Sequence, residues 1–337
     1  MNNSLEQKFK ATHSSSDVER VPSIIIVNAS KDSTTPRAKM NTQDTTYDET
    51  ESENGQKRMN LTEYIHLYHQ QMNSSFIEPT LTLWQTWSSH IFPGKLESYW
   101  QKIMARNPQY TRKVLNDTEI ELYVAQHCPG AYSDLFHSVN PELKAMRADL
   151  WRYCALYSSG GVYLDADSGV NLNISFKTWI HKNVVLSQEG HRWEKMKSSC
   201  RTVWRASNEI FPERVVTPNS ILQWAMVFPL PRHPILKEAM ELATRLISAW
   251  EDKTDNHWST HNRIVCLSGP ALLSVATNRA YEEAGQDWDK LMVSMEGVDF
   301  NGKLLYKTPQ SGELYKKSQH YNNIGSGTPI KVRAESV

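Results

Sequence analysis

The sequence contains no hydrophobic run that is long enough to cross a membrane. A membrane-spanning helix needs about 20 predominantly apolar residues, whereas the most apolar run near the N-terminus is the short Ile-Ile-Ile-Val of residues 24–27. This run is also too short to form the core of a signal peptide. We therefore expect no transmembrane segment.

An excess of charge of either sign is also missing. Lysine and arginine together number 37, as do aspartate and glutamate, in a chain of 337 residues. A chain with neither net charge nor a basic cluster lacks the field that attracts nucleic acid or an anionic membrane. We therefore expect no nucleic-acid partner.

Cysteine is scarce and widely spaced. The chain has Cys128, Cys154, Cys200 and Cys266, and no two of them are spaced as in a C-x-x-C or zinc motif. Their even number permits disulfides without implying them. Cys154 falls on the apolar face of a predicted helix, where we expect it to act as a small core residue.

The N-terminal part of the chain has few aromatic residues and is rich in Ser, Thr, Asn and charged residues. Such a composition cannot bury enough apolar surface to fold alone. We expect residues 1–75 to form a polar, disordered tail with a short helix at residues 61–71. Residues 76–337, which show no internal repeat or linker, should form one folded domain.

The most informative segment is residues 146–169, which read MRADLWRYCALYSSGGVYLDADSG. Asp165 and Asp167 directly follow a short apolar strand predicted at residues 162–164. Because residues two positions apart in an extended chain share one face, both carboxylates can approach a single point beyond the strand end. Two hard oxygen ligands on a short tether suit Mg²⁺ or Mn²⁺, which also bind substrate phosphates.

A helix should precede this strand. Asn140-Pro141-Glu142 is typical of a helix start, and Gly160-Gly161 is typical of a helix end, where a left-handed residue is cheapest as glycine. Asp149 and Arg152 stand three residues apart and share a helix edge. They can simply pair with each other, or they can serve a binding site.

Two other interpretations of the D-x-D segment fail when the residues are counted. A calcium-binding EF-hand loop that begins at Asp165 needs glycine at its sixth position and glutamate at its twelfth. The chain has Val170 and Phe176 there. An aspartyl-phosphate type of phosphatase expects Thr or Val where the chain has Gly169.

The segment resembles glycosyltransferase family 32, whose pattern is A-D-[ILW]-x-R-Y, a few apolar residues, and G-G-[VI]-Y-[LA]-D-x-D. The matching residues are Ala148, Asp149, Trp151, Arg152, Tyr153, Gly160, Gly161, Val162, Tyr163, Leu164, Asp165 and Asp167. The resemblance implies a GT-A-like α/β fold with a mixed sheet flanked by helices. It also implies that residues 76–337 are a catalytic domain that retains the anomeric configuration of the transferred sugar.

The resemblance implies a role for each charged residue of the segment. Asp167 would ligate Mn²⁺ or Mg²⁺, and Asp165 would hold the metal or the ribose and sugar of the donor. Arg152 would neutralise the leaving diphosphate, and Asp149 would orient hydroxyls of the donor sugar. The donor would be a GDP- or UDP-sugar, with mannose favoured, and the acceptor a glycan, a glycolipid or a protein.

More distant parts of the family pattern imply further site residues. Gln85 and Trp87 lie in a Q-T-W sequence that the family places near the nucleotide base. The other residues implied in donor binding are Gly160, Gly161, Asn219, Gly269 and Pro270, and the residues implied in completing the metal site are His320 or Ser326. The family has a tryptophan where this chain has Gly327, and the preceding Ile-Pro of the first strand is also missing.

The rest of the domain alternates between strand and helix patterns, which is typical of a layered α/β domain. Strands are expected at residues 82–84, 183–187 and 224–228, and helices at residues 95–105 and 118–127. A further helix should begin at His233-Pro234, where the histidine has a structural role. Residues 189–211 are either an insertion that lines the acceptor side or a solvated excursion.

Two other functions remain open. A degenerate nucleotide-sugar-binding protein without turnover would explain the departures in the first strand and at Gly327. A glycoside hydrolase needs two carboxylates about 5 to 9.5 Å apart across a sugar, whereas Asp165 and Asp167 share one strand end, which suits a shared ion better.

We expect the enzyme in the cytoplasm or at a membrane surface, and in the Golgi lumen only if an N-terminal anchor precedes this chain. The N-x-[ST] sequences, which are acceptors of glycans only in a lumen, are expected mostly by chance in a chain this rich in Asn, Ser and Thr. They begin at Asn2, Asn28, Asn60, Asn73, Asn116 and Asn173.

Overall fold

The protein is described here by a computed structural model. The described residues are 59–74, 77–172, 175–179, 183–188, 193–212, 215–217, 219–250, 259–296, 299–305 and 328–331. They all belong to one compact unit, Ser52–Val337. The expected disordered tail up to residue 58, and the candidate metal ligands His320 and Ser326, lie outside the described residues.

A six-stranded mixed sheet forms the centre of this unit. Its strands are ordered β2-β1-β3-β6-β5-β7. Their bounds are β1 Thr82–Thr86, β2 Thr111–Leu115, β3 Gly161–Leu164, β5 Val184–Leu186, β6 Ala225–Phe228 and β7 Val293–Met295. The pairs β1–β2, β1–β3 and β5–β7 are parallel, whereas β6 runs antiparallel to both β3 and β5. The predicted α/β class with a mixed sheet is confirmed.

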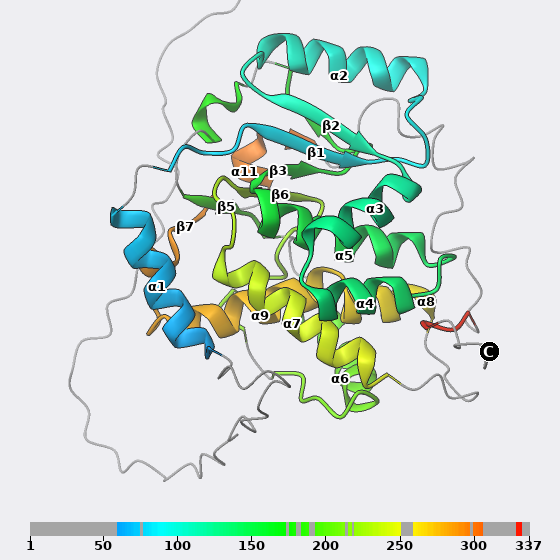
Figure 1. The fold of residues 1–337 in the computed structure, drawn as a ribbon, viewed down its shortest axis with the longest axis vertical. Coiled ribbons are helices and arrows are strands. Elements are labelled where there is room, and N and C mark those ends of the chain that lie inside the picture. The colour runs from blue at the N-terminus through cyan, green and yellow to red at the C-terminus, as the bar shows by residue number, and fades with distance from the viewer. Residues whose placement is uncertain are drawn as a thin grey trace, which may run out of the picture. The chain divides into compact units, whose positions relative to one another are not determined.

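Helices cover both faces of the sheet (Figure 1). α2 (Gly94–Arg106) covers one face, and α3 (Asp117–His127), α4 (Gly130–Ser138) and α5 (Lys144–Ser159) lie on the other side together with α7 (Pro234–Ser248) and α9 (Pro270–Glu283). The alternation of side chains in β3 explains this arrangement. Val162 and Leu164 pack in the α2 cluster, whereas Tyr163 packs in the larger cluster of the opposite face.

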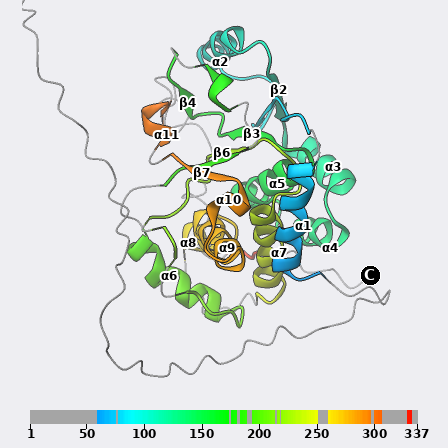
Figure 2. The same ribbon diagram turned by 90° about the vertical axis from the view of Figure 1, so that its left-hand side faces the viewer.

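Further elements complete the unit, as the turned view shows (Figure 2). The helices are α1 (Leu61–Ser74), α6 (Trp193–Arg205), α8 (Thr260–Leu267), α10 (Trp288–Leu291) and α11 (Asp299–Gly302), with a 3₁₀ turn at Phe176–Trp179. β4 (Gly169–Val170) directly follows the D-x-D segment and pairs with β8 (Leu304–Leu305) as a separate two-stranded sheet. This ribbon continues the chain beyond the end of β3.

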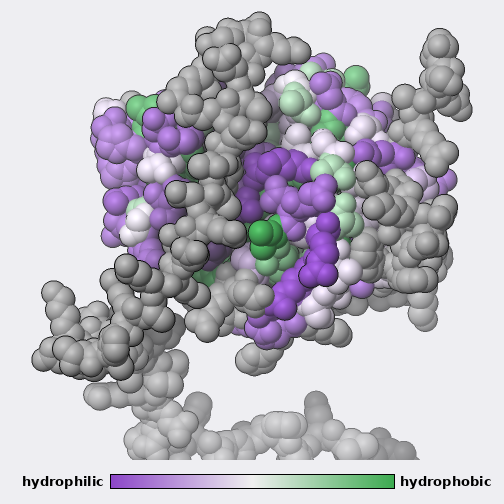
Figure 3. All heavy atoms as spheres, turned by 90° about the horizontal axis from the view of Figure 1, so that it is seen from below, coloured by the Kyte–Doolittle hydropathy of each residue, from purple (hydrophilic) through white to green (hydrophobic). Residues whose placement is uncertain are grey.

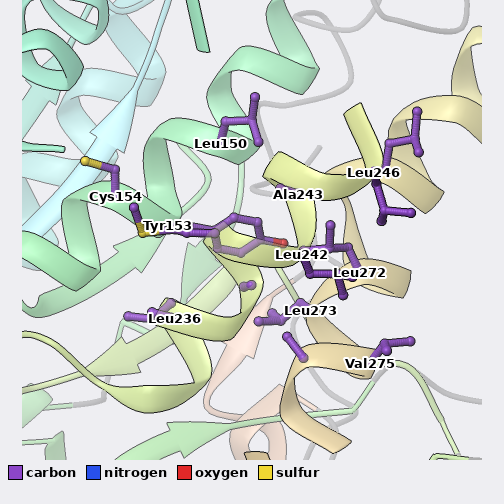
Figure 4. Close-up of a cluster of buried hydrophobic side chains, with 14 of the residues drawn as sticks. Leu150, Tyr153, Cys154, Leu236, Leu242, Ala243, Leu246, Leu272, Leu273 and Val275 are labelled. Carbon is purple, nitrogen blue, oxygen red and sulfur yellow. The ribbon is translucent and has the colours of Figure 1, made fainter. Parts of the chain in front are cut away.

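The largest core lies between α5, α7 and α9 (Figure 4). Leu150 and Tyr153 of α5 face Leu242 and Leu246 of α7, and Leu272 belongs to the α9 side of the same cluster. These side chains are fully buried. Burial of a leucine of this kind contributes about 2 kcal/mol, so α5 is held in place mainly by apolar packing.

α5 ends where the sequence predicts but begins later. Gly160 is its C-terminal cap with a φ of 69°, as expected for glycine. The helix begins at Lys144, however, because the side chain of Asn140 accepts a hydrogen bond from the nitrogen of Glu142 and forms a turn there. The prediction that Asn140-Pro141-Glu142 starts the helix is therefore wrong by about one turn.

The segment around α6 is not a solvated excursion. Cys200, Val203 and Trp204 of α6 are fully buried, and the indole of Trp204 donates to the carbonyl of Cys266 at 2.8 Å. The outer face of the unit near α6 is mainly hydrophilic, with a small apolar patch (Figure 3). α6 is thus an amphipathic helix with one buried side.

α1 packs on the same unit through Ile65, Tyr68 and Met72. The ring of Tyr68 makes an edge contact with His233, the N-terminal cap of α7. Among the residues that the structure describes, no helix is both long and apolar enough to cross a membrane.

His233 makes the stability of the fold sensitive to acid. Its Nε2–H donates to the carbonyl of Leu291 at 2.7 Å, and its Nδ1 accepts from the nitrogen of Ile235. Burial lowers the pKa of His233 from 6.5 to about 4. Because the folded pKa lies below the unfolded value, this stability is present above about pH 6.5 and is lost as pH falls toward about pH 4.

We predict that acidification from about pH 8 to about pH 5 costs roughly 2 kcal/mol of unfolding free energy through His233. The His233→Gln variant should be less stable at both pH values but should lose this pH dependence. Denaturant unfolding at both pH values measures the difference. The exposed His137→Gln control should keep the wild-type dependence, and an unchanged dependence in His233→Gln would contradict the assignment.

Candidate functional site

Three charged side chains meet where β3 ends. Arg152 of α5 pairs with Asp149, one helical turn earlier, at 3.3 Å, and with Asp165, just after β3, at 3.2 Å. The simple pairing of Asp149 with Arg152 therefore exists. It is part of a larger cluster, however, because the same guanidinium also reaches the first aspartate of the D-x-D motif.

Arg152 is held on several sides. Its guanidinium carbon lies 4.4 Å from the centre of the Tyr163 ring, and its Nη1 donates to the carbonyl of Gln223 at 3.2 Å. Burial disfavours the charged guanidinium, but Tyr163, Asp165 and Asp149 outweigh that cost and raise the pKa of Arg152 above its ordinary value. The site therefore contains a permanent, buried positive charge.

Asp149 is a buried carboxylate with an unusual proton affinity. Burial raises its pKa to about 7, although Arg152 and the hydroxyl of Ser268 oppose this rise. The Ser268 hydroxyl donates to Oδ2 of Asp149 at 2.9 Å. Asp149 thus changes its charge near neutral pH, in the range where many enzymes operate.

The turn that contains Ser268 is tied to α5 by a second set of hydrogen bonds. The hydroxyl of Tyr153 donates to the carbonyl of Ser268 at 2.8 Å, and the side chain of Gln223 donates to the same carbonyl at 2.8 Å. Neither Gln223 nor Ser268 was among the site residues predicted from the sequence. For Ser268 the sequence did offer a signal, because this residue directly precedes the donor-binding candidates Gly269 and Pro270.

The two aspartates of the D-x-D motif are both half-buried. Oδ1 of Asp165 accepts a hydrogen bond of 2.6 Å from the hydroxyl of Tyr163, and the backbone nitrogen of Asp165 donates to the carbonyl of Trp224. The Ser168 hydroxyl closes the turn by donating to the carbonyl of Asp165. This turn presents Asp167 two residues beyond Asp165, at the start of the β4–β8 ribbon.

Gly160 and Gly161 lie at the opposite end of β3 from the aspartates. An added Cβ at Gly161 would lie 2.5 Å from the carbonyl of Thr82, and φ is 113° there. The carbonyl of Gly160 accepts from the indole of Trp84. Gly161 therefore allows β3 to pack closely on β1, and Gly160, where a Cβ would lie 3.0 Å from the carbonyl of Pro229, allows close approach to the end of β6. The structure does not bring either glycine to the carboxylates.

Gln85 is also engaged in packing. Its side chain is fully buried, its Oε1 accepts from Arg112 at 2.7 Å, and its Nε2 donates to the carbonyl of Leu164 at 3.4 Å. Trp87 follows β1 and makes an edge contact with Phe92. The parallel pairing of β1 with β3 places Trp87 at the sheet edge where Asp165 lies.

The remaining donor-binding candidates are spread along the chain. Gly269 caps α9 and Pro270 is its first residue, and both follow Ser268 directly. A Cβ at Gly269 would lie 2.7 Å from the Cα of Val265, so glycine is needed for close packing on α8. Asn219 is half-buried, and its carbonyl accepts from the Thr217 hydroxyl.

Residues 93–186 match the family model described as a glycosyltransferase sugar-binding region containing a DXD motif. The match includes α5, β3 and the cluster of Asp149, Arg152 and Asp165. The chain thus contains a region similar to glycosyltransferases that carry a DXD motif.

Parts of the chain are similar to known proteins. A segment of 122 residues is 30% identical to the initiation-specific alpha-1,6-mannosyltransferase of Candida albicans (strain SC5314 / ATCC MYA-2876), and it covers 33% of this chain and 29% of that protein. The solved structure of the PaToxG glycosyltransferase matches 81% of this chain and 90% of that chain, with 15% identity and a TM-score of 0.42.

We predict that Ser268→Ala weakens the folded state in a pH-dependent way. A hydrogen bond to an ionised group contributes about 2 kcal/mol and one to a neutral group about 1 kcal/mol. Since the pKa of Asp149 is about 7 in the folded protein, the loss should be about 2 kcal/mol at pH 9 and about 1 kcal/mol at pH 5. Denaturant unfolding at the two pH values measures it.

In the wild-type protein, Asp149 itself decides whether this contribution to folding stability rises or falls with pH. Its folded pKa lies above the unfolded value of 3.8, so its contribution to stability is present below about pH 4 and is lost as pH rises through about 7. Ser274→Ala is the matched control, because this buried hydroxyl bonds, within the described part of the chain, only backbone groups of Pro270 and Ile221. Equal pH dependence in the two variants would contradict the role of Ser268.

Proposed function

We propose that this chain is a metal-dependent, retaining glycosyltransferase that moves a hexose from a nucleotide sugar to a glycan, glycolipid or protein acceptor. The observation that carries the proposal is the bridge from Asp149 through Arg152 to Asp165, inside the D-x-D region. This cluster combines carboxylates that suit a divalent cation with a buried cation that suits a phosphate.

The donor set of the D-x-D turn fits Mn²⁺ or Mg²⁺. Such ions are commonly held by one or two carboxylates and complete their coordination with water and substrate phosphates. Oδ1 of Asp165 accepts a hydrogen bond from Tyr163 and pairs with Arg152. As the family resemblance implies, Asp167 would be a direct ligand of the ion, and Asp165 would hold the ion or the donor. No group of three or more His, Cys, Asp or Glu that could hold a metal is present among the described residues.

Each residue of the cluster has a task in the proposed reaction. A bound divalent cation would supply Lewis-acid stabilisation of the leaving diphosphate. Arg152 would add a fixed positive charge toward the same phosphates, which is effective because it is buried and already oriented. Asp149 would accept hydrogen bonds from hydroxyls of the donor sugar and thereby position it.

Mannose is the favoured sugar because the curated relative is named as an alpha-1,6-mannosyltransferase. Retention of the anomeric configuration rests on the resemblance to family 32. The buried state of Gln85, which pairs with Arg112, supports the second candidate function, a nucleotide-sugar-binding protein without turnover. In that case Trp87 alone of the Q-T-W sequence would remain near the nucleotide.

We predict that the full chain releases GDP or UDP from one sugar nucleotide in the presence of Mn²⁺. Asp167→Asn should lower this rate by at least about 100-fold, because the donor diphosphate loses its metal-dependent stabilisation. The measurement is nucleotide release across a panel that includes GDP-mannose, UDP-glucose, UDP-galactose and UDP-N-acetylglucosamine. Asp289→Asn, at an exposed position in the distant α10, should leave the rate unchanged.

The result separates the two candidate functions. Silence with every donor, together with Mn²⁺-dependent nucleotide binding that Asp167→Asn removes, would favour the binding protein. Absence of both turnover and binding would show that the D-x-D turn holds no metal.

A further inference from the structure

All four cysteines of the chain lie in described residues, and the structure joins them in two pairs. Cys128 is bonded to Cys154, and Cys200 to Cys266, with Cα–Cα separations of 5.8 and 5.2 Å. Both separations fall within the range of protein disulfides. The two disulfides join different pairs of helices, so each supports disulfide formation independently of the other. No free cysteine remains.

Each disulfide connects a helix that contains or adjoins the site with a neighbouring helix. Cys154 lies on α5, two positions after Arg152, and Cys128 caps the end of α3. Cys266 lies in the last turn of α8, two positions before Ser268, and its partner Cys200 is in α6. The disulfides therefore anchor α5 and the end of α8, which are the two segments that meet at Asp149.

Disulfides of this kind persist in oxidising compartments and are rare in the cytosol, where thiols are kept reduced. Cys154, Cys200 and Cys266 are fully buried, which is typical of structural disulfides and not of exchangeable surface thiols. The observed pairing therefore favours a lumenal or extracellular environment over the cytoplasmic one that the sequence alone suggests.

A candidate glycosylation site at Asn60 is consistent with the same lumenal environment. Asn60-Leu61-Thr62 is an N-x-[ST] sequence, and Asn60 is exposed immediately before α1. Its amide oxygen accepts a hydrogen bond from the nitrogen of Glu63 at 2.8 Å, as in a helix cap. A glycan would be joined to the amide nitrogen, so the cap and the glycan are compatible.

The other described sequences of this type are less suitable. Asn116 is half-buried in the capping box of α3, where its oxygen accepts from the nitrogen of Glu119 and its amide nitrogen lies 3.1 Å from His90. The amide nitrogen of Asn73 lies 3.2 Å from His69 within the last turn of α1. Asn60 is therefore the best acceptor among the described residues.

We propose that the chain matures in an oxidising lumen, where Cys128–Cys154 and Cys200–Cys266 form and Asn60 receives an N-linked glycan. The glycan donor is a lipid-linked oligosaccharide diphosphate. A bond forms between Nδ2 of Asn60 and C1 of the first sugar, while the C1–O bond breaks. The lipid diphosphate leaves with that electron pair, and the amide nitrogen gives up one proton.

Thiol counting tests the disulfides without any variant. The full chain, tagged at its C-terminus and isolated from the cells that naturally produce it, is denatured and treated with a maleimide polymer before and after reduction. We expect no labelled cysteine before reduction and labelling of all four afterwards. Peptide mapping should join Cys128 to Cys154 and Cys200 to Cys266. Free thiols before reduction, or other pairs, would overturn this part of the proposal.

Glycosidase treatment of the same protein tests Asn60. We expect removal of N-glycans to lower the mass, and Asn60→Asp to lack one glycan, because aspartate keeps the oxygen that caps α1 but has no amide nitrogen. Asn116→Asp is the matched control and should keep the wild-type mass shift. No shift in the wild type, or an unchanged shift in Asn60→Asp, would overturn the assignment.

Discussion

The pairing of one buried guanidinium with two carboxylates is the interaction on which the rest of the site depends. Arg152 reaches Asp149 on its own helix and Asp165 at the end of β3, so it joins the helical layer to the sheet. A buried charge is tolerated only when it is paired and hydrogen-bonded, and loss of one partner of a buried pair costs about 3 to 5 kcal/mol. The positions of α5 and β3 and the electrostatics of the site are therefore coupled.

The surrounding structure buries Asp149 and Arg152 and holds them in place. Apolar packing of α5 against α7 and α9 fixes the direction of the helix, and the glycine turn after it returns the chain directly into β3. Tyr153 faces that core, yet its hydroxyl bonds the carbonyl of Ser268. One residue thus takes part in both core packing and the polar network. A fixed set of dipoles around developing charge needs little reorganisation during a reaction, which is why such a scaffold suits transfer chemistry.

The local part of this arrangement was predictable from the sequence, and the long-range part was not. The end of α5 at Gly160, the strand β3 and the shared edge of Asp149 and Arg152 follow from spacing within one segment. Ser268 and Gln223 reach the cluster from 119 and 71 residues away, and no local pattern encodes such contacts. Gly160 and Gly161 show the converse: their spacing marked them correctly as a turn, but the length of β3 separates that turn from Asp165 and Asp167.

The charge balance of the cluster gives a physical reason for a divalent cation. Asp149, Asp165 and Asp167 bring three carboxylates to a segment in which Arg152 supplies one positive charge. Above the pKa of Asp149, which is about 7, these four groups carry a net charge of about −2, and protonation of Asp149 lowers it to about −1. A diphosphate that approached these carboxylates without a cation would be repelled. A divalent ion held by Asp165 and Asp167, as proposed, would reverse the local sign, and the charge of Arg152 would then add to that of the ion toward the phosphates.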